Sequence, residues 1–135
     1  MKNVITLIIL IFTTLTVSAQ IGVSKSKIIQ NNSDYILDVT EDGTEYITYV
    51  VEFDNYDRHV ACYLTNKEDD EEQICYRVAY IEPSSETNNW VRYFNNENFI
   101  KLEGMTWKDY EHSMLYEVVV KDGSCLVIKS YDEKL

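Results

Sequence analysis

The chain has 135 residues, of which 45% are hydrophobic and 26% are charged, and its formal net charge at pH 7 is −11. A charge of this sign repels phosphate backbones and anionic lipid surfaces, so nucleic acids and membrane surfaces are excluded as expected partners. Eleven tyrosines and a single proline, Pro83, argue against a disordered chain.

Residues 1–19 have the pattern of a secretory signal peptide. Lys2 gives a positive start, residues 4–12 are almost entirely apolar, and small residues end the segment at Ala19. The apolar run is shorter than the ~20 residues of a membrane-spanning helix, which favours cleavage after Ala19 over a membrane anchor. We therefore expect one secreted or periplasmic domain over residues 20–135, without membrane insertion and with a formal charge of −12 once Lys2 is removed.

The first half of this domain is expected to hold a short helix and four strands. Ser24 is a suitable N-cap for a helix over residues 24–32. The Asp-Gly pair at 42–43 is a type I′ hairpin signal between two runs that are rich in β-forming residues. Two further strands are predicted at residues 60–65 and 74–81, from their β-branched and aromatic content.

The second half is expected to hold a helix followed by two or three strands. Pro83 breaks the sheet and allows a helix over residues 84–98. Residues 107–120 read mostly as one strand, and the Asp-Gly pair at 122–123 predicts a hairpin to a last strand at 124–131. Sequential hairpins imply an antiparallel meander with both helices on one face, so the predicted fold class is α+β.

Three cysteines raise the question of a disulfide, which export would permit. Pairing the strands by their apolar faces aligns Cys62 with Tyr76 and turns Cys75 to the opposite face, which disfavours a bridge between these two cysteines. Two alternatives stay open, a bridge from Cys125 to Cys62 or Cys75, and three buried thiols. The five acids at 68–72 lack the glycine and the ligand spacing of a calcium loop, so no metal site is predicted.

Catalytic residues do not form a familiar constellation. His59 is three residues from Cys62 and therefore points to the other face of a strand. His112 has no second histidine at the spacing of a zinc site. Four glycines in the whole chain leave no room for the usual phosphate-binding loops, and no cofactor is expected. We expect a protein that is not an enzyme; a small hydrolase or thiol enzyme using His59 or His112 is the less favoured alternative.

The abundance of tyrosine is the feature that points to binding. Tyrosine is amphipathic and is enriched at interfaces and on sugar-binding surfaces. If helices cover one face of the sheet, the other face meets solvent or a partner. The candidate binding residues on that open face are Tyr46, Tyr63, Tyr76, Tyr80 and Trp107. The alternative is that the tyrosines only line a half-buried sheet, where their propensity is high.

Several segments resemble small secreted proteins of Bacteroidota that have no assigned activity. They are IEPSSETNN (81–89), WKDY (107–110), VVVKDG (118–123), SCLVIKSY (124–131) and the Ala-Gln end of the signal (19–20). The resemblance implies export, and it carries over no functional residue.

A weaker similarity is to the inhibitor-like and barrel-assembly-lipoprotein folds, which are built from helix-plus-hairpin units. It rests on GVS (22–24), GMT (104–106) and a faint internal repeat between VTEDGT (39–44) and VVKDGS (119–124). Turns use a small set of residue types, so unrelated turns can also produce an apparent repeat of this kind. The chain departs from the lipoprotein pattern because no cysteine follows the expected cleavage point.

The favoured hypothesis is an exported, non-catalytic binding or protein-interaction domain that acts on a protein or glycan in the cell envelope. A sharper version is an inhibitor or immunity protein whose acidic surface caps a basic partner. Such a protein is expected to bind its partner less tightly as the salt concentration rises.

Overall fold

The computed structural model describes residues 21–67 and 72–132, and it contains one antiparallel sheet and two α-helices. The elements in chain order are α2 (Lys25–Asn31), β1 (Ile36–Val39), β2 (Glu45–Glu52), β3 (Asp57–Leu64), β4 (Cys75–Pro83), the 3₁₀ turn η1 (Ser84–Glu86), α3 (Thr87–Asn96), β5 (Ile100–Lys101), β6 (Thr106–Asp109), β7 (Met114–Lys121) and β8 (Ser124–Tyr131). This arrangement confirms the predicted α+β class. Neither described helix is long and apolar enough to span a bilayer.

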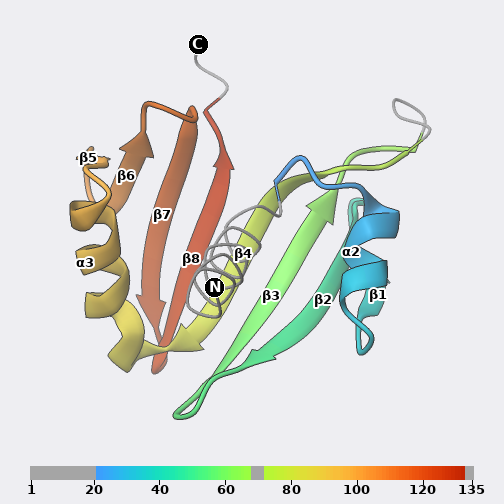
Figure 1. The fold of residues 1–135 in the computed structure, drawn as a ribbon, viewed down its shortest axis with the longest axis horizontal. Coiled ribbons are helices and arrows are strands. Elements are labelled where there is room, and N and C mark those ends of the chain that lie inside the picture. Colours follow the sequence, from blue (N-terminus) through green and yellow to red (C-terminus); the bar gives the residue numbers. More distant parts are fainter. Residues whose placement is uncertain (1–20, 68–71, 133–135) are drawn as a thin grey trace, which may run out of the picture.

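The sheet consists of two meanders that meet at one seam. Its strand order is β1-β2-β3-β4-β8-β7-β6-β5, so each half is a helix followed by four strands, and the last strands of the two halves pair with each other. Figure 1 shows β4 and β8 side by side in the middle of the molecule. The two halves are therefore related by an approximate twofold arrangement about this seam.

The faint sequence repeat does not coincide with this structural repeat. Residues 39–44 form the hairpin between β1 and β2, the first of its half, whereas residues 119–124 form the hairpin between β7 and β8, the last of its half. Residues 22–24 precede a helix, whereas residues 104–106 lead into β6. Shared turn chemistry accounts for the similarity of these segments better than repetition of a unit does.

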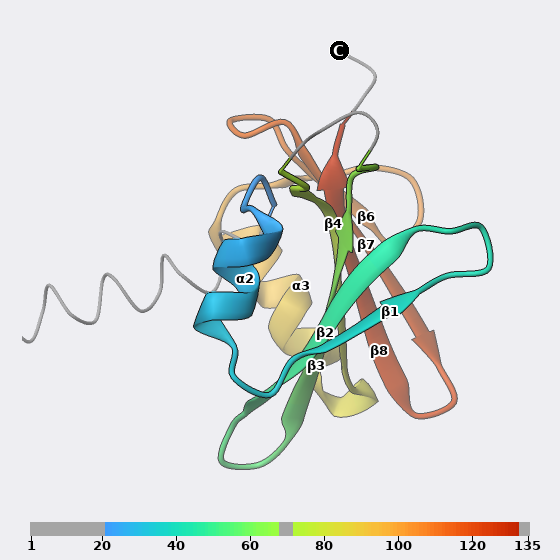
Figure 2. The ribbon, with the colours of Figure 1, turned by 90° about the vertical axis from the view of Figure 1, so that its right-hand side faces the viewer.

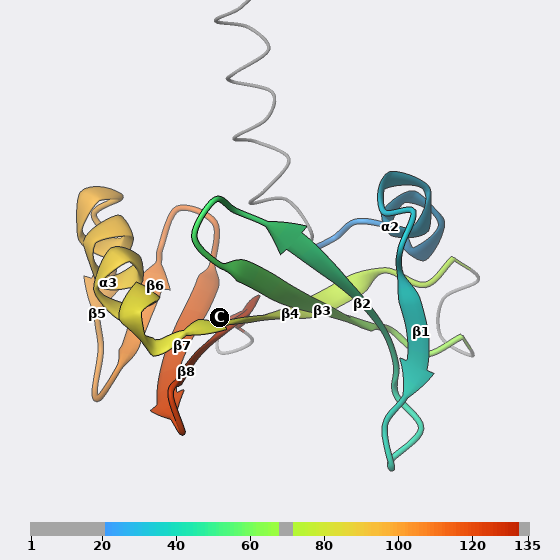
Figure 3. The ribbon, with the colours of Figure 1, turned by 90° about the horizontal axis from the view of Figure 1, so that it is seen from below.

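Both helices cover the same face of the sheet, and the core lies between them and the strands. Figures 2 and 3 show α2 and α3 on one side of the sheet, α2 near β1 and α3 near β5 and β6. Ile28 of α2 and Phe94 of α3 are completely buried, together with Ile47 and Val78 of the sheet. The predicted placement of two helices on one face is confirmed.

The helix α2 begins at the predicted N-cap. The Ser24 hydroxyl accepts a hydrogen bond from the backbone N–H of Lys27. The preceding chain is tied to the start of β4, because the Gly22 N–H donates to the Cys75 carbonyl and the Cys75 N–H donates to the Val23 carbonyl. These bonds orient a helix of seven residues, too short to be stable alone.

The two Asp-Gly pairs make different turns. Asp122 and Gly123 both have positive φ, 52° and 78°, as the predicted type I′ turn requires. At the first pair only Gly43 has positive φ, and the Thr40 N–H donates to the Thr44 carbonyl. The hairpin is present, but the type I′ prediction is wrong, because the Asp42 carboxylate accepts hydrogen bonds from Thr40 and Thr44 and stabilises a longer turn.

The predicted single strand over residues 107–120 is divided into β6 and β7. The Asp109 carboxylate accepts hydrogen bonds from the backbone N–H groups of Glu111, at 3.1 Å, and His112, at 3.2 Å. Ser113 then adopts a positive φ of 54°. The side chain of Asp109 thus stabilises a tight turn that overrides the β-propensity of the flanking residues.

The strands β3 and β4 pair two residues away from the predicted register. Cys62 lies opposite Val78 instead of Tyr76. Because the difference is an even number of residues, the apolar faces of the two strands still match. The register then shifts again at a β-bulge, where Leu64 pairs with Cys75. The bulge is the feature that local patterning did not predict.

This bulge places Cys75 on the same face as Cys62, so the prediction of opposite faces is wrong. Of the two alternatives that the sequence leaves open, the bridge from Cys125 to Cys62 or Cys75 does not fit the strand registers. Cys125 pairs with Glu82, which is about 23 Å along β4 from Cys75 and about 13 Å from Val78, the partner of Cys62. A disulfide requires Cα atoms within about 7 Å. All three thiols are free and buried in the structure.

Candidate functional site

The helix-free face of the sheet is the candidate site, and we call it the open face. It spans β2, β3, β4, β8 and β7, and both described helices lie on the opposite side (Figure 2). The strand registers place these residues on it: Tyr46, Thr48, Val50, His59, Ala61, Tyr63, Arg77, Ala79, Ile81, Leu126, Ile128, Ser130, Leu115, Glu117 and Val119. Most of them are apolar or aromatic, although the chain as a whole is strongly acidic.

Three aliphatic residues of the open face are unusually exposed. Val50 is 48% exposed, Ile81 41% and Val119 38%. The three residues lie in one row across the strands, in which His59 stands between Val50 and Ile81, and Leu126 stands between Ile81 and Val119. The row is apolar without interruption from Ile81 to Val119, and exposed apolar surface of this kind is typical of a protein interface.

One end of the open face carries an aromatic pair. Tyr46 and Tyr63 are cross-strand partners on β2 and β3, with ring centroids 5.5 Å apart and ring planes tilted by 32°. Both rings are half-buried. The Tyr46 hydroxyl donates to the Asp38 carboxylate at 3.5 Å, and the negative charge of this carboxylate raises the pKa of Tyr46. Arg77 continues the row as the partner of Tyr63.

A groove of about 570 Å³ lies at the same ends of β2, β3 and β4. It is lined by Asp42, Gly43, Thr44, Glu45, Leu64, Thr65, Asn66, Lys67, Gln73 and Tyr76. Tyr76 is half-buried, and the Arg77 guanidinium lies 5.9 Å from its ring centroid. The structure thus brings three of the five candidate residues, Tyr46, Tyr63 and Tyr76, to one end of the sheet, which we call the tyrosine end.

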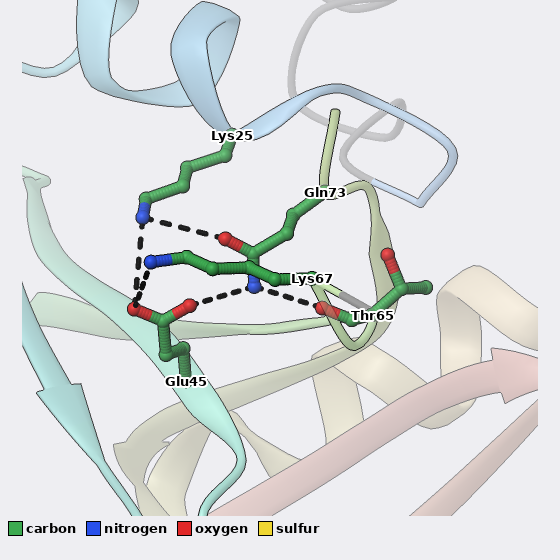
Figure 4. A network of polar contacts seen from close by, with 5 residues as sticks. All are labelled: Lys25, Glu45, Thr65, Lys67 and Gln73. Atoms are coloured by element: carbon green, nitrogen blue, oxygen red, sulfur yellow. Dashed lines mark hydrogen bonds and ion pairs between the residues drawn. The ribbon is translucent and has the colours of Figure 1, made fainter. Parts of the chain in front are cut away.

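A polar network forms one wall of the groove (Figure 4). The Gln73 amide nitrogen donates to the Glu45 carboxylate at 2.7 Å and to the Thr65 carbonyl at 2.8 Å, and its amide oxygen accepts from Lys25 at 3.4 Å. Glu45 also forms ion pairs with Lys25, at 3.7 Å, and with Lys67, at 3.6 Å. The network joins α2, β2 and the segment after β3.

The network settles the charge state of its carboxylate. The hydrogen bond from Gln73, followed by the charges of Lys25 and Lys67, holds the pKa of Glu45 below its usual value. Gln73 is only 5% exposed, and both ends of its amide are hydrogen-bonded. This wall is therefore a fully hydrogen-bonded, pre-organised surface.

The prediction that Tyr80 and Trp107 lie on the open face is wrong. Tyr80 is 5% exposed and Trp107 is 1% exposed. Tyr80 packs on Trp90 of α3, with centroids 5.4 Å apart, and Trp107 packs on Phe94 at 4.8 Å. Both share the parity of the core positions of their strands, so the helix-covered face buries them.

The aliphatic residues Val50, Ile81 and Val119 are the part of the surface that the tyrosine-based prediction omitted. Each of them lies between two core-facing positions of its strand. Period-two alternation would have assigned them to the helix-free face once the core face was known. Residue type alone does not assign them to this face, because β-branched residues are favoured on either face of a sheet.

The histidines do not assemble with a thiol. His59 points to the open face, whereas Cys62 points to the core. The His112 imidazole Nδ1 lies 2.8 Å from the Asp109 carboxylate, where it supports the turn between β6 and β7. Among the described residues, no group of three or more histidine, cysteine or acidic side chains comes close enough to hold a metal ion.

Comparison with known proteins returned no matching family model, curated protein or solved structure. Inferences about the activity of this chain therefore rest on the geometry of the open face, the tyrosine end and the adjoining groove.

Proposed function

We propose that the protein is an exported, non-catalytic interaction domain that binds a protein partner in the cell envelope through the open face. The exposed aliphatic residues of this face carry the proposal, since Val50, Ile81 and Val119 are 38–48% exposed on a surface that neither described helix covers. The signal-peptide pattern of residues 1–19 supports export.

The tyrosine end is the part of the surface that gives the interaction its specificity. Tyr46, Tyr63 and Tyr76 combine apolar rings with hydroxyl groups, and Arg77 adds a guanidinium beside them. Tyrosine and arginine are over-represented among the residues that contribute most of the binding free energy at interfaces. A partner that covers the aliphatic residues is expected to place polar groups against this end.

The charge of the chain favours a basic partner. The formal net charge is −11 for the whole chain, and a surface of this sign attracts cationic proteins and repels acidic ones. An inhibitor or immunity protein that caps a basic protein is the version of the proposal that this charge supports best. A glycan is less favoured, because the paired rings of Tyr46 and Tyr63 tilt by 32° and are half-buried, not flat and exposed.

Two neighbouring valines of β7 provide a matched test of the proposal. Val119 lies on the open face and is 38% exposed, whereas Val120 lies on the other face and is 52% exposed. We expect Val119→Arg to reduce capture of an envelope partner at least tenfold, and Val120→Arg to leave it unchanged. Each purified variant is immobilised as bait, and the partner that it captures from envelope extracts is quantified. Thermal unfolding first confirms that both variants are folded.

The salt dependence of capture distinguishes a basic protein partner from a partner that is not attracted by the acidic charge. Capture of a basic protein partner is expected to decrease between low and high ionic strength. Equal loss of capture in both valine variants, or unchanged capture in Val119→Arg, would contradict the assignment of the open face. Absence of a stoichiometric protein partner at low salt would contradict the proposed function itself.

A further inference from the structure

A pair of buried cysteines is a feature that the proposed function does not use. Cys62 lies in β3 and Cys75 is the first residue of β4, and both are completely buried. The thiols interact directly with each other. Cys125 lies elsewhere in the core, near the start of α3, where Thr87 approaches its thiol.

The β-bulge is the reason why the two cysteines meet. Without it, strict alternation along β4 would direct Cys75 to the open face. With it, Leu64 pairs with Cys75, and Cys62 is the next residue of β3 on the same face. Cys62 and Cys75 are thus diagonal cross-strand neighbours on the core face, and a hydrogen bond between their thiols shifts the pKa of both.

We propose that Cys62 and Cys75 form an intramolecular disulfide when the exported protein meets a disulfide donor. The donor is a small-molecule or protein disulfide of an oxidising compartment. One cysteine thiolate attacks the donor disulfide and expels the first donor thiol, leaving a mixed disulfide. The second cysteine thiolate then attacks the mixed disulfide and expels the second donor thiol. Two protein thiols are oxidised to one disulfide, and one donor disulfide is reduced to two thiols.

The expected order of reaction follows from the contact between the thiols. The hydrogen bond with Cys75, together with one from Tyr49, lowers the pKa of Cys62, so Cys62 is the thiol of the pair that ionises more readily where these native contacts persist. Both thiols are inaccessible in the folded protein, so the donor reaches them during folding or through local opening near the bulge.

The disulfide would fix the wall of the groove. Leu64, Thr65, Asn66, Lys67 and Gln73 line the groove, and all five lie in the segment that the two cysteines bound. Closing this segment restricts the unfolded chain and is expected to raise the unfolding temperature by several degrees. The inference rests on the proposed export but not on the identity of the partner.

Refolding in a redox buffer tests the inference directly. The purified protein is unfolded in reductant, refolded with reduced and oxidised glutathione, and trapped by alkylation. We expect one alkylated thiol instead of three, and a mass lower by about 2 Da than that of the reduced protein once the alkyl groups are subtracted, because two hydrogens are lost. Trypsin cleaves at Arg58, Lys67 and Arg77, so the bridge is expected to link peptide 59–67 to peptide 68–77. Peptide 122–129, which contains Cys125, is expected to carry a free thiol.

Serine variants provide the control. In Cys125→Ser the bridge and its effect on the unfolding temperature are expected to persist, whereas Cys62→Ser and Cys75→Ser abolish both. A dominant link to peptide 122–129, or three free thiols in protein that has refolded in the redox buffer, would overturn the inference. Because glutathione is the only reagent, failure here is distinguishable from failure to find a partner.

Discussion

At the scale of single residues, Arg58 shows how this acidic chain stabilises a buried carboxylate. The Arg58 guanidinium lies 5.0 Å from the ring centroid of Phe53, 5.3 Å from that of Tyr80 and 5.1 Å from that of Trp90. It also forms an ion pair with Glu82, whose side chain is 1% exposed. The pair is therefore desolvated, and each charge is stabilised in the protein interior by the opposite charge of its partner.

Removal of one partner of this pair is expected to cost far more than removal of both. Arg58→Met leaves the Glu82 carboxylate buried without its cation, and we expect the free energy of unfolding to fall by about 3–5 kcal/mol. Combining it with Glu82→Gln should recover much of that loss, because the unpaired charge is gone. Urea unfolding of the four proteins in a double-mutant cycle measures the coupling. Simple additivity of the two substitutions would contradict the inferred pairing.

Glu45 gives a pH prediction at the same scale. Its pKa is lower in the folded protein than in the unfolded chain, mainly because of Gln73. Such a group contributes stability above its unfolded pKa of about 4.5, and the contribution is lost as the pH falls through the folded pKa. Glu45→Gln is therefore expected to flatten the decrease in stability between pH 5 and pH 3. Parallel curves of the urea midpoint against pH for both proteins would contradict this role.

At the scale of elements, the sequence predicts helix caps and turns, but it does not predict the register between β3 and β4. Ser24, Pro83 and the two Asp-Gly pairs mark the helices and hairpins correctly, because caps and turns depend on a few adjacent residues. The bulge between β3 and β4 depends on how two strands compete for apolar partners, and no single segment encodes it. The positions of Cys62 and Cys75 could not be deduced for that reason.

The helix α2 illustrates dependence on tertiary contacts. It has seven residues and buries Ile28 completely, whereas Ile29 is only partly buried against the core. We expect Ile28→Ala to lower the free energy of unfolding by about 2–5 kcal/mol, because it leaves a cavity between α2 and the sheet. Ile29→Ala is the matched control and should cost clearly less. Equal losses, measured by chemical unfolding, would show that α2 docks differently.

At the scale of the whole molecule, the two halves share one core and leave one face open. The aromatic rings of α3 pack against β6 and β7, and Ile28 of α2 belongs to the same buried cluster. The α+β class followed from the order of hairpins and helices. The pairing of β4 with β8 did not, because it joins residues far apart in the sequence and leaves no local pattern.

The candidate site shows the same limit. Tyr46 and Tyr63 are predicted on the open face and lie there, whereas Tyr76, predicted with them, lines the groove at the same end of the sheet. Tyr80 and Trp107 were assigned to the same surface but are buried. Residue type alone does not distinguish the faces of a strand, since aromatic side chains suit a core as well as an interface.

Site-specific photo-crosslinking in the cell envelope tests the central proposal most directly. A photoreactive phenylalanine analogue replaces Tyr63, on the open face, or Tyr110, which is 59% exposed at the turn after β6. Irradiation is expected to join position 63 to one protein, more strongly at low salt than at high salt, and to leave position 110 without that adduct. The same adduct from both positions, or none from position 63, would contradict binding through the open face.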